Sequence, residues 1–483
     1  MKYPMQAYFP LVSLAVGFAL LVIHATAAAA ESKQRPNIIF ILADDLGYGD
    51  LGCYGQKRIK TPHLDKLAAE GLRFTDFYAG STVCAPSRCV LMTGYHTGHA
   101  VVRGNARVPL RPVDVTLAEV LKTAGYQTAL CGKWGLGEEG STGVPTRQGF
   151  DYFFGYLNQH HAHNYYPAYL FRNEERVPLK NVVPGSGDYG SGVAAERSEY
   201  SHDLVAAEAL KFVEQQKDNP FFLYLAFTTP HANNEAGKEG MEVPDLGAYA
   251  DTDWPPQQKA HAAMISRMDA DIGRLMQKLK SLGIAENTLV FFSSDNGPHR
   301  EGGNDPDFND SNGPLKGIKR DLTEGGIRVP FIAHWPGKIA GGKTSDYIGS
   351  FHDLMPTLAE LMGATADVPK DIDGISFLPT LLGQPEKQKA HDYLYWAFYE
   401  RGGAQAARTG KWKAIQQPLA SPVRLYDLSS DIGEEHDLAA TQPQVVAKLK
   451  AAMNAAYVPS DQWKFPAPGE NEGKKGKGAK KTK

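Results

Sequence analysis

The chain has 483 residues, 42% of them apolar and 22% charged, enough for roughly three domains or for one large and one small domain. Its net charge is −3, and the six lysines of the last ten residues leave −9 on the remainder. A body of that charge disfavours nucleic acid as a partner. The Lys/Gly-rich residues 469–483 are expected to be disordered, with tethering to a polyanion as the alternative.

The first 30 residues have the composition of a secretory signal peptide. Lys2 is the only charge before the apolar run 11–23, and the small residues 25–30 offer cleavage sites. The run is shorter than the about 20 residues of a membrane span, and no other stretch comes close. We therefore expect an exported protein, periplasmic or extracellular, with no transmembrane segment.

Strands and helices alternate from residue 31 to residue 384. Isoleucine-rich residues 37–42 indicate a strand buried on both faces, Thr61-Pro62 begins a helix, and Cys84 precedes an apolar run typical of a buried helix. Further elements follow in the same alternation. Helices are predicted within 115–126, 202–216 and 262–283, and strands within 127–135, 220–231 and 287–297.

This alternation predicts an α/β fold with a large mixed, mostly parallel sheet flanked by helices on both faces. After residue 384 the segments become short, aromatic and separated by turns. They predict a smaller C-terminal antiparallel sheet packed with a terminal helix over 443–457. The expected organisation is a main domain over 31–384 and a small α+β subdomain over 385–468.

Polar side chains follow three of the predicted buried strands. Asp44-Asp45, His231 and Asp295-Asn296 come at or just after the carboxyl ends of these strands, where ligands bind in open α/β sheets. If the strands are neighbours, three carboxylates and one amide oxygen converge. Oxygen ligands suit Ca²⁺ or Mg²⁺, and Ca²⁺ tolerates irregular geometry better. The alternative is that each pair only caps a turn or helix.

Four cysteines occur, which are Cys53, Cys84, Cys89 and Cys131. They are too few for a disulfide framework, although export would allow one pair to form. None has the C-x₂-C spacing of a zinc site. Cys84 therefore remains open among packing, a disulfide and chemistry.

The residues around Cys84 resemble a known family motif, and this resemblance favours a chemical role for Cys84. Cys84-Ala85-Pro86-Ser87-Arg88 resembles the C-x-P-S-R motif of the type I sulfatases, a family of the alkaline phosphatase superfamily, and the following CVLMTG resembles the rest of its signature. Seven segments in all resemble family blocks in the family's order. They are residues 37–55, 61–88, 125–137, 221–231, 289–297, 315–337 and 424–439.

The resemblance implies an arylsulfatase-like enzyme that releases sulfate from a sulfate ester. It implies that a formylglycine-generating or sulfatase-maturating enzyme oxidises Cys84 to formylglycine (3-oxoalanine) during export. One hydroxyl of the hydrated aldehyde attacks sulfur, and the second lets the sulfated adduct eliminate sulfate, which a serine could not do. One Ca²⁺, with Mg²⁺ as the second choice, is expected on Asp44, Asp45, Asp295, Asn296 and the converted Cys84.

Further roles follow by matching residues to the family motifs. Arg88 is expected to stabilise the charged nucleophile, and Lys133 and Lys319 to bind sulfate, with Lys316 as the rival of Lys319 if the loop is shifted. His231 is expected to bind sulfate or to protonate the leaving alcohol. The chain departs from the family at Gly135, where the family has a histidine. Replacements considered are His96, His99, His160, His161 and His163.

The long loops at about 135–200 and 231–260 are rich in Gly, Pro, His and Tyr, and loops of that length are usually functional. Aromatic and polar side chains in 96–105 and 158–173 suit a sulfated saccharide, unless their tyrosines only pack on the core. The expected substrate-binding residues are His99, Arg103, Asn105, His161, His163 and Lys316. Alternatives are a phosphodiesterase or phosphonate monoester hydrolase on the same scaffold, or a glycan-binding relative that has lost catalysis.

Overall fold

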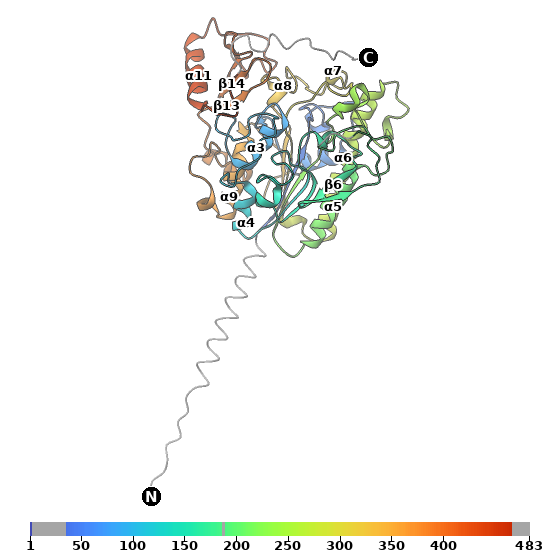
Figure 1. Cartoon of the computed structure of the whole chain (residues 1–483). Helices are drawn as coiled ribbons and strands as arrows, with labels where there is room; N and C mark the ends of the chain where they lie inside the picture. Colours follow the sequence, from blue (N-terminus) through green and yellow to red (C-terminus); the bar gives the residue numbers. More distant parts are fainter. Residues whose placement is uncertain (2–34, 186–188, 466–483) are drawn as a thin grey trace.

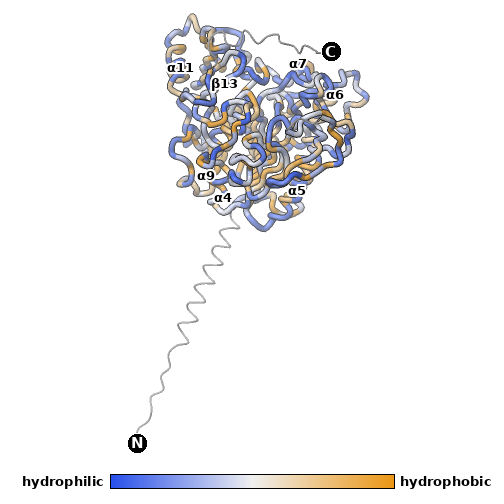
Figure 2. Tube along the Cα trace, viewed as in Figure 1, coloured by the Kyte–Doolittle hydropathy of each residue, from blue (hydrophilic) through white to orange (hydrophobic). Residues whose placement is uncertain are grey.

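The computed structural model describes Met1 and residues 35–185 and 189–465. The lysine-rich tail and all but the first residue of the predicted signal peptide lie outside these residues. Figure 1 shows one body in which helices lie on both sides of a central sheet. Figure 2 shows hydrophobic segments running through the middle of this body, with hydrophilic segments at most of its surface turns.

The central sheet has ten strands in the order β11-β2-β10-β9-β1-β8-β4-β5-β6-β7. Strands β9, β1, β8, β4 and β5 pair in parallel, whereas β10 and β6 join them antiparallel on either side. This mixed, mostly parallel sheet confirms the predicted fold class. Its strands are β1 (Asn37–Ala43), β2 (Leu72–Phe74), β4 (Gln127–Lys133), β5 (Tyr152–Tyr156), β6 (Tyr169–Arg172), β7 (Glu175–Pro178), β8 (Phe221–Ala226), β9 (Thr288–Ser294), β10 (Phe331–His334) and β11 (Lys343–Ser345).

Side chains that alternate along β1 enter two separate cores. Ile38, Phe40 and Leu42 pack with helices α3 (Cys84–Thr93), α4 (Leu117–Thr123) and α9 (Leu354–Met362). Ile39 and Ile41 pack on the other face with α2 (Pro62–Glu70), α5 (Ser201–Gln215) and α6 (Pro256–Ser281). A strand buried on both faces must be apolar throughout, which explains the isoleucine-rich run. Short helices α7 (Pro306–Asn309), α8 (Glu324–Ile327) and α10 (Leu378–Leu381) and the strand pair β3 (Phe77–Tyr78) and β12 (Gly349–Ser350) complete this part.

Residues 135–200, read from the sequence as a long loop, contain three strands that extend the sheet. Strands β6 and β7 form an antiparallel hairpin whose turn holds Asn173 at a φ of 54°. Asparagine tolerates this left-handed conformation, which two-residue hairpin turns require. The frequent Gly, His and Pro residues around these short strands hid their alternation.

A second sheet follows, as predicted, with strands β13 (Leu394–Phe398), β14 (Ala404–Thr409), β15 (Trp412–Gln416) and β16 (Arg424–Asp427) in antiparallel order. One face packs on helix α11 (Pro443–Ala456), and the other packs against the main body at Tyr78, Leu322 and Ile327. The C-terminal sheet thus lies between its own helix and the large domain.

Polar contacts fasten the C-terminal sheet to the loop before α8. The Lys413 ammonium lies 2.7 Å from Glu324 and 3.0 Å from Glu434, and all three side chains are buried. Gln417 Oε1 accepts a hydrogen bond of 3.0 Å from the main-chain N–H of Leu322. Buried ion pairs of this kind are costly to break because one charge would be left unpaired.

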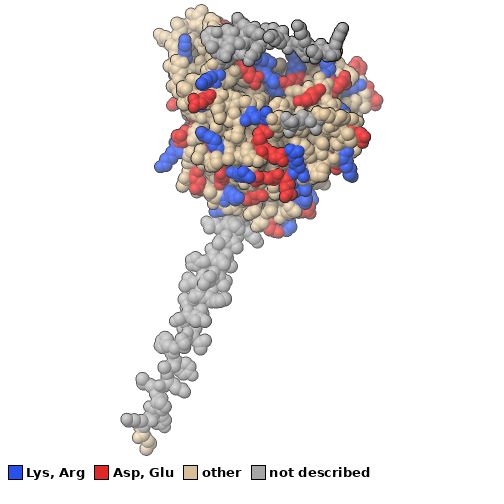
Figure 3. Space-filling model, viewed as in Figure 1, with Lys and Arg blue, Asp and Glu red and all other residues tan. Residues whose placement is uncertain are grey.

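No helix of the described residues is long and apolar enough to cross a membrane. All four cysteines are free thiols, so the disulfide that export would allow is not formed in this structure. On the face drawn in Figure 3, lysine and arginine alternate with aspartate and glutamate. Neither sign of charge dominates this face.

Candidate active site

The predicted strand ends lie at one edge of the sheet. Strand β1 has β8 on one side and β9 on the other, and β4 lies beyond β8. In register, Ala43 is opposite Ser294 of β9, and Leu42 and Gly132 are both opposite Ala226 of β8. The side chains that follow these positions converge and are at most 3% exposed. They are Asp44, Asp45, Lys133, His231, Asp295 and Asn296, joined by Cys84, Arg88 and Lys319 from outside the sheet.

Asp44 and Asp45 are consecutive residues whose carboxylates have different partners. Asp44 Oδ2 lies 2.6 Å from the Lys133 ammonium, and Asp45 Oδ2 lies 2.7 Å from the Lys319 ammonium. Asp45 has a φ of 64°, a left-handed conformation that aspartate adopts more readily than most residues. This turn after β1 lets both carboxylates enter the same site.

Cys84 is the first residue of α3, and its thiol lies 3.4 Å from Asp44 Oδ1. Burial, and then the charge of Asp44, raises the pKa of the Cys84 thiol well above its usual range. Since the thiolate is the reactive form, an unmodified Cys84 would be a poor nucleophile at neutral pH.

Arg88 lies one turn further along α3 and is fully buried. Its guanidinium donates to Asp295 Oδ2 at 2.8 and 3.1 Å and to the carbonyl of Lys133 at 2.7 Å, and it lies 3.4 Å from Asp44. This fork holds two acids and the end of β4 in one arrangement. Burial, and then the charge of Asp44, nevertheless raises the pKa of Asp295 to about 7.

His231 and Lys319 form a pair on the other side of the site. His231 Nδ1 lies 2.7 Å from the Ala232 carbonyl, and Nε2 lies 3.0 Å from the Lys319 ammonium. Burial, and then the charge of Lys319, lowers the pKa of His231 well below its usual range. The neutral ring therefore carries its proton on Nδ1 and accepts from Lys319 through Nε2.

The oxygen atoms of this cluster fit a hard cation. Ligand atoms of Asp44, Asp45, Cys84 and His231 lie within 4.8 Å of one another. Asn296 donates to Asp45 Oδ1 at 2.6 Å, but no described residue forms a hydrogen bond with its own buried Oδ1. An orphaned amide oxygen beside three carboxylates is a donor set that Ca²⁺ or Mg²⁺ would satisfy.

Two of the predicted substrate-binding residues adjoin the cluster. Asn105 Oδ1 accepts a hydrogen bond of 3.0 Å from the main-chain N–H of Ala85, next to Cys84. The His163 ring stacks on the His231 ring at a centroid distance of 5.0 Å, and its Nδ1 lies 3.2 Å from Glu235. Both therefore belong to the rim of the site.

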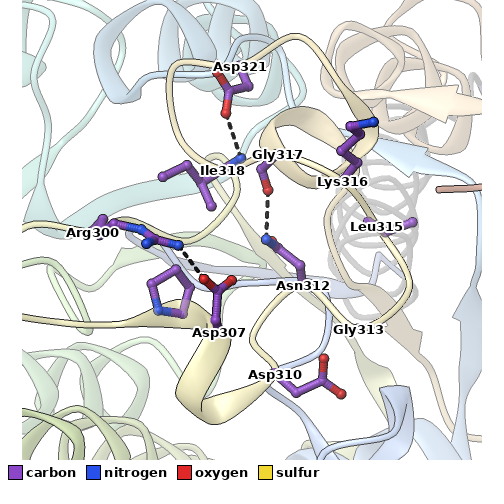
Figure 4. A pocket seen from close by; sticks show the side chains of 11 residues that line it. Arg300, Asp307, Asp310, Asn312, Gly313, Leu315, Lys316, Gly317, Ile318 and Asp321 are labelled. Atoms are coloured by element: carbon purple, nitrogen blue, oxygen red, sulfur yellow. Dashed lines mark hydrogen bonds and ion pairs between the residues drawn. The ribbon is translucent and has the colours of Figure 1, made fainter. Parts of the chain in front are cut away.

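The other four predicted substrate-binding residues are engaged elsewhere. His99 pairs with Asp373, Arg103 is buried and donates to the carbonyls of Ala100 and Val458, and His161 is buried against aromatic rings. Lys316 lines a pocket of ≈ 440 Å³ together with Arg300, Asp307 and Asp321 (Figure 4). Its ammonium contacts the Glu434 carbonyl and Glu435. Lys319, not Lys316, thus reaches the acidic cluster.

At Gly135 the structure gives a physical reason for the missing side chain. Gly135 has a φ of 84°, and a Cβ there would lie 2.0 Å from the Gln159 amide nitrogen. Gln159 therefore fills the space that a side chain at residue 135 would need. Its Oε1 is buried without a hydrogen-bond partner.

Sequence reasoning missed two residues near the cluster. Glu301 lies 3.1 Å from the Lys319 ammonium and 2.5 Å from the Arg320 guanidinium. The His299 ring stacks on the His231 ring at 5.8 Å. Both follow Asp295-Asn296 within six residues. Their position in the loop just after the carboxyl end of β9 could have indicated that they lie near the site.

Comparison with known proteins agrees with this geometry. The profile of the Sulfatase family matches residues 36–364, and that of the N-sulphoglucosamine sulphohydrolase C-terminal region matches residues 318–458. Arylsulfatase A of Homo sapiens is 35% identical over 485 residues, covering 88% of each chain. N-acetylgalactosamine-6-sulfatase of Canis lupus familiaris is 34% identical, covering 83% of this chain and 76% of the relative.

The fold also matches solved structures. The structure of Ps i-CgsB in complex with k-i-k-neocarrahexaose superimposes with a TM-score of 0.75 at 28% identity, covering 90% of this chain and 96% of that one. Together with the sequence matches, the fold and the site define a sulfuric ester hydrolase. The chain belongs to the sulfatase family, among the type I sulfatases of the alkaline phosphatase superfamily.

Proposed function

We propose that this sulfatase is exported and hydrolyses a sulfate ester of a carbohydrate, using a formylglycine made from Cys84 and one Ca²⁺ ion. The position of Cys84 carries the proposal. It lies at the start of α3 against Asp44, yet burial keeps its thiol protonated and unreactive. Cys84 thus occupies the position expected of the nucleophile but is itself a poor nucleophile. Conversion of its side chain to formylglycine would explain this combination.

The cation and the modified residue would complete the chemistry. When bound, the ion supplies charge that polarises the sulfate oxygens, and the hydrated aldehyde supplies one hydroxyl for attack and a second for release of sulfate. Asp44, Asp45, Asp295 and Asn296 would hold the ion through their oxygen atoms. The orphaned Asn296 Oδ1 supports this assignment.

Lys133 and Lys319 would bind the sulfate group. The three carboxylates Asp44, Asp45 and Asp295 are matched by three cations, which are Arg88, Lys133 and Lys319. A divalent cation therefore gives the cluster a surplus of positive charge, which the anionic sulfate ester would offset. Fixed cations in a buried site stabilise developing charge far better than cations in water.

His231 and Lys319 would deliver the proton that the leaving alcohol needs. The Lys319 ammonium already donates toward His231 Nε2 at 3.0 Å, and the imidazole is neutral. A proton passed from Lys319 Nζ to His231 Nε2 would make the imidazole the acid that protonates the leaving alkoxide, and Lys319, left neutral, would be reprotonated from solvent. Arg88 would hold Asp44 and Asp295 in place and would not touch the substrate.

The remaining assignments follow from the sequence. We propose export through the signal peptide at 1–30, conversion of Cys84 by a maturation enzyme, and division into domains at 31–384 and 385–468. A carbohydrate substrate is supported by the names of the relatives, which include an N-acetylgalactosamine-6-sulfatase. Nucleic acid is not expected to bind the negatively charged body.

Mass spectrometry and turnover test the proposal together. The tryptic peptide 74–88 from active enzyme should lack the Cys84 sulfur, with oxygen in its place and two hydrogens fewer. Cys84→Ala should abolish turnover of an aryl sulfate, whereas the matched variant Cys53→Ala should retain it. A peptide that stays fully alkylatable in active enzyme would refute the modification, and faster turnover of an aryl phosphate diester would favour the phosphodiesterase alternative.

Metal removal tests the cation separately. Treatment with a chelator should abolish aryl sulfate turnover, and Ca²⁺ should restore it more fully than Mg²⁺. Asn296→Ala should raise the Ca²⁺ concentration needed for half-maximal restoration. If the chelated protein keeps full activity, the ion has no role in the reaction.

A further inference from the structure

A second positively charged group lies beside the cluster and takes no part in it. Asn105 ties the loop after α3 to the main-chain N–H of Ala85, next to Cys84. Two residues further along this loop, the exposed Arg107 stacks its guanidinium over the ring of Tyr189 at 3.6 Å. The loop therefore carries a cation close to the start of α3.

Within the described residues Arg107 has no carboxylate at ion-pair distance, which distinguishes it from three other arginines of this region. Arg111, Arg147 and Arg176 each form an ion pair, with Asp114, Glu174 and Glu139 respectively. No carboxylate within residues 35–185 and 189–465 forms an ion pair with Arg107. The nearby Glu138 instead accepts a hydrogen bond of 3.1 Å from Asn158.

Arg107 lines two adjoining hollows. The narrower one is lined by Asn105, Gly135 and Gln159 and reaches the loop beside Cys84. The wider one, of ≈ 450 Å³, is lined by Tyr169, Tyr189 and Arg176. Arg107, Glu138 and Asn158 line both, so the wide hollow adjoins the narrow one, of only ≈ 10 Å³, and the two together are called the groove.

The geometry points to a subsite for a second sugar that carries its own anionic group, with Arg107 as the residue that binds that group. This inference rests on the proposed function. The substrate class is thus a polyanionic oligosaccharide, in which the sugar next to the one that is desulfated bears a carboxylate or a second sulfate. Tyr189 holds the guanidinium in place, and Arg107 and its neighbours face the groove.

The chemistry of the groove supports a sugar over other occupants. The amide groups of Asn158 and Gln159 and the carboxylate of Glu138 line the groove and match the hydroxyl groups of a pyranose. The buried Gln159 Oε1 has no donor among the described residues, so a hydroxyl of the ligand would satisfy it. A planar guanidinium binds carboxylate or sulfate through two parallel hydrogen bonds, which a lysine cannot do.

Competition against aryl sulfate turnover tests the subsite. Tetrasaccharides from chondroitin sulfate, heparin and carrageenan, and a sulfated monosaccharide from each, are used as inhibitors of nitrophenyl sulfate hydrolysis. We expect Arg107→Gln to weaken inhibition by at least one tetrasaccharide roughly tenfold or more, and to change inhibition by its monosaccharide less than twofold. The matched variant Arg111→Gln should behave as the wild type.

The outcomes separate this inference from the proposed function. If Arg107→Gln leaves every tetrasaccharide inhibition constant unchanged, the subsite is refuted and the sulfatase activity stands. If the wild type does not hydrolyse nitrophenyl sulfate, the proposed function fails, and calorimetric titration of the same tetrasaccharides still reports on Arg107. Carboxyl-reduced chondroitin sulfate distinguishes a bound carboxylate from a bound second sulfate. If Arg107 binds the uronate carboxylate, Arg107→Gln should no longer weaken inhibition by the carboxyl-reduced tetrasaccharide.

Discussion

The cluster at the strand ends and the groove around Arg107 differ in how their charges are matched. In the cluster each carboxylate meets a lysine or arginine of the chain, and all these side chains are buried. In the groove Arg107 is exposed, and no carboxylate of the described part of the chain forms an ion pair with it. The charges of the first arrangement are paired within the protein, and under the proposed function this arrangement would serve any sulfate ester. In the second arrangement the ligand would supply the anion that pairs with Arg107, so selectivity among substrates can arise there.

Removing a charge from the cluster should therefore cost stability, and removing one from the groove should not. Arg88→Met leaves Asp44 and Asp295 without their buried partner, so the free energy of unfolding should fall by about 3–5 kcal/mol. Arg107→Met, the matched variant in the groove, should change it by less than about 0.5 kcal/mol. Urea denaturation in the presence of a chelator measures the free energy of unfolding of both variants. Equal losses would contradict the proposed difference between the cluster and the groove.

Two lysines of one loop sharpen the contrast in activity. Lys319→Ala removes a cation that contacts Asp45 and His231, and kcat/KM for an aryl sulfate should fall about 10²–10³-fold. Lys316→Ala removes a cation that contacts the Glu434 carbonyl and the exposed Glu435, away from the cluster, and kcat/KM should stay within about twofold. If Lys316→Ala instead lowers kcat/KM more than Lys319→Ala, Lys316 and not Lys319 is the lysine that acts in the reaction.

Beneath the groove, His161 should make the protein sensitive to acid. Burial lowers its pKa from 6.5 to about 3, and within residues 35–185 and 189–465 neither ring nitrogen has a hydrogen-bond partner. The unfolded chain takes up the proton first as pH falls, so stability is lost between pH 6.5 and about 3, by roughly 1.4 kcal/mol per pH unit.

His161→Phe removes this titration and keeps an aromatic ring in the pocket. Plotted against pH, the variant's free energy of unfolding should fall less steeply below pH 6.5. His96, His202 and His261, whose pKa burial also lowers to about 3, retain part of the slope. Parallel curves for the two proteins would show that His161 does not titrate on unfolding.

The smallest effect is expected where the groove meets the cluster. Gly135→Ala forces a side chain onto a φ of 84° and against the Gln159 amide, which should lower the free energy of unfolding by about 1–3 kcal/mol. Adding Gln159→Ala should restore the part of this loss that comes from the clash and leave the backbone part. Thermal unfolding of the two variants measures the difference, and no recovery would mean that Gln159 moves aside freely.

The sequence predicted the cluster well because parallel strands bring their ends to one edge. The runs before Asp44, His231 and Asp295 were recognisable as buried strands, and the order β9-β1-β8 made them neighbours. Cys84 and Lys319 lie outside the sheet and were identified by their resemblance to family motifs. The fold class rested on the same alternation of strands and helices.

The rim could not be predicted in the same way, because the direction of a loop side chain depends on distant contacts. Arg103 turns inward because the Val458 carbonyl, 355 residues away, accepts its hydrogen bond. Arg107, in the same loop, turns outward onto Tyr189. No periodicity in residues 96–109 distinguishes these two arginines, and the same holds for His161 and His163.

The attachment of the C-terminal sheet has a consequence for recombining relatives of this protein. Lys413 and Gln417 hold Glu324 and Leu322, only a few residues beyond the Lys319 ammonium that meets Asp45. A chimera that joins the main body of one homologue to the final hundred residues of another would combine non-matching partners for these two contacts. Exchanging residues 315–326 together with the sheet should keep the lysine aligned, so the two stretches are best inherited as one unit.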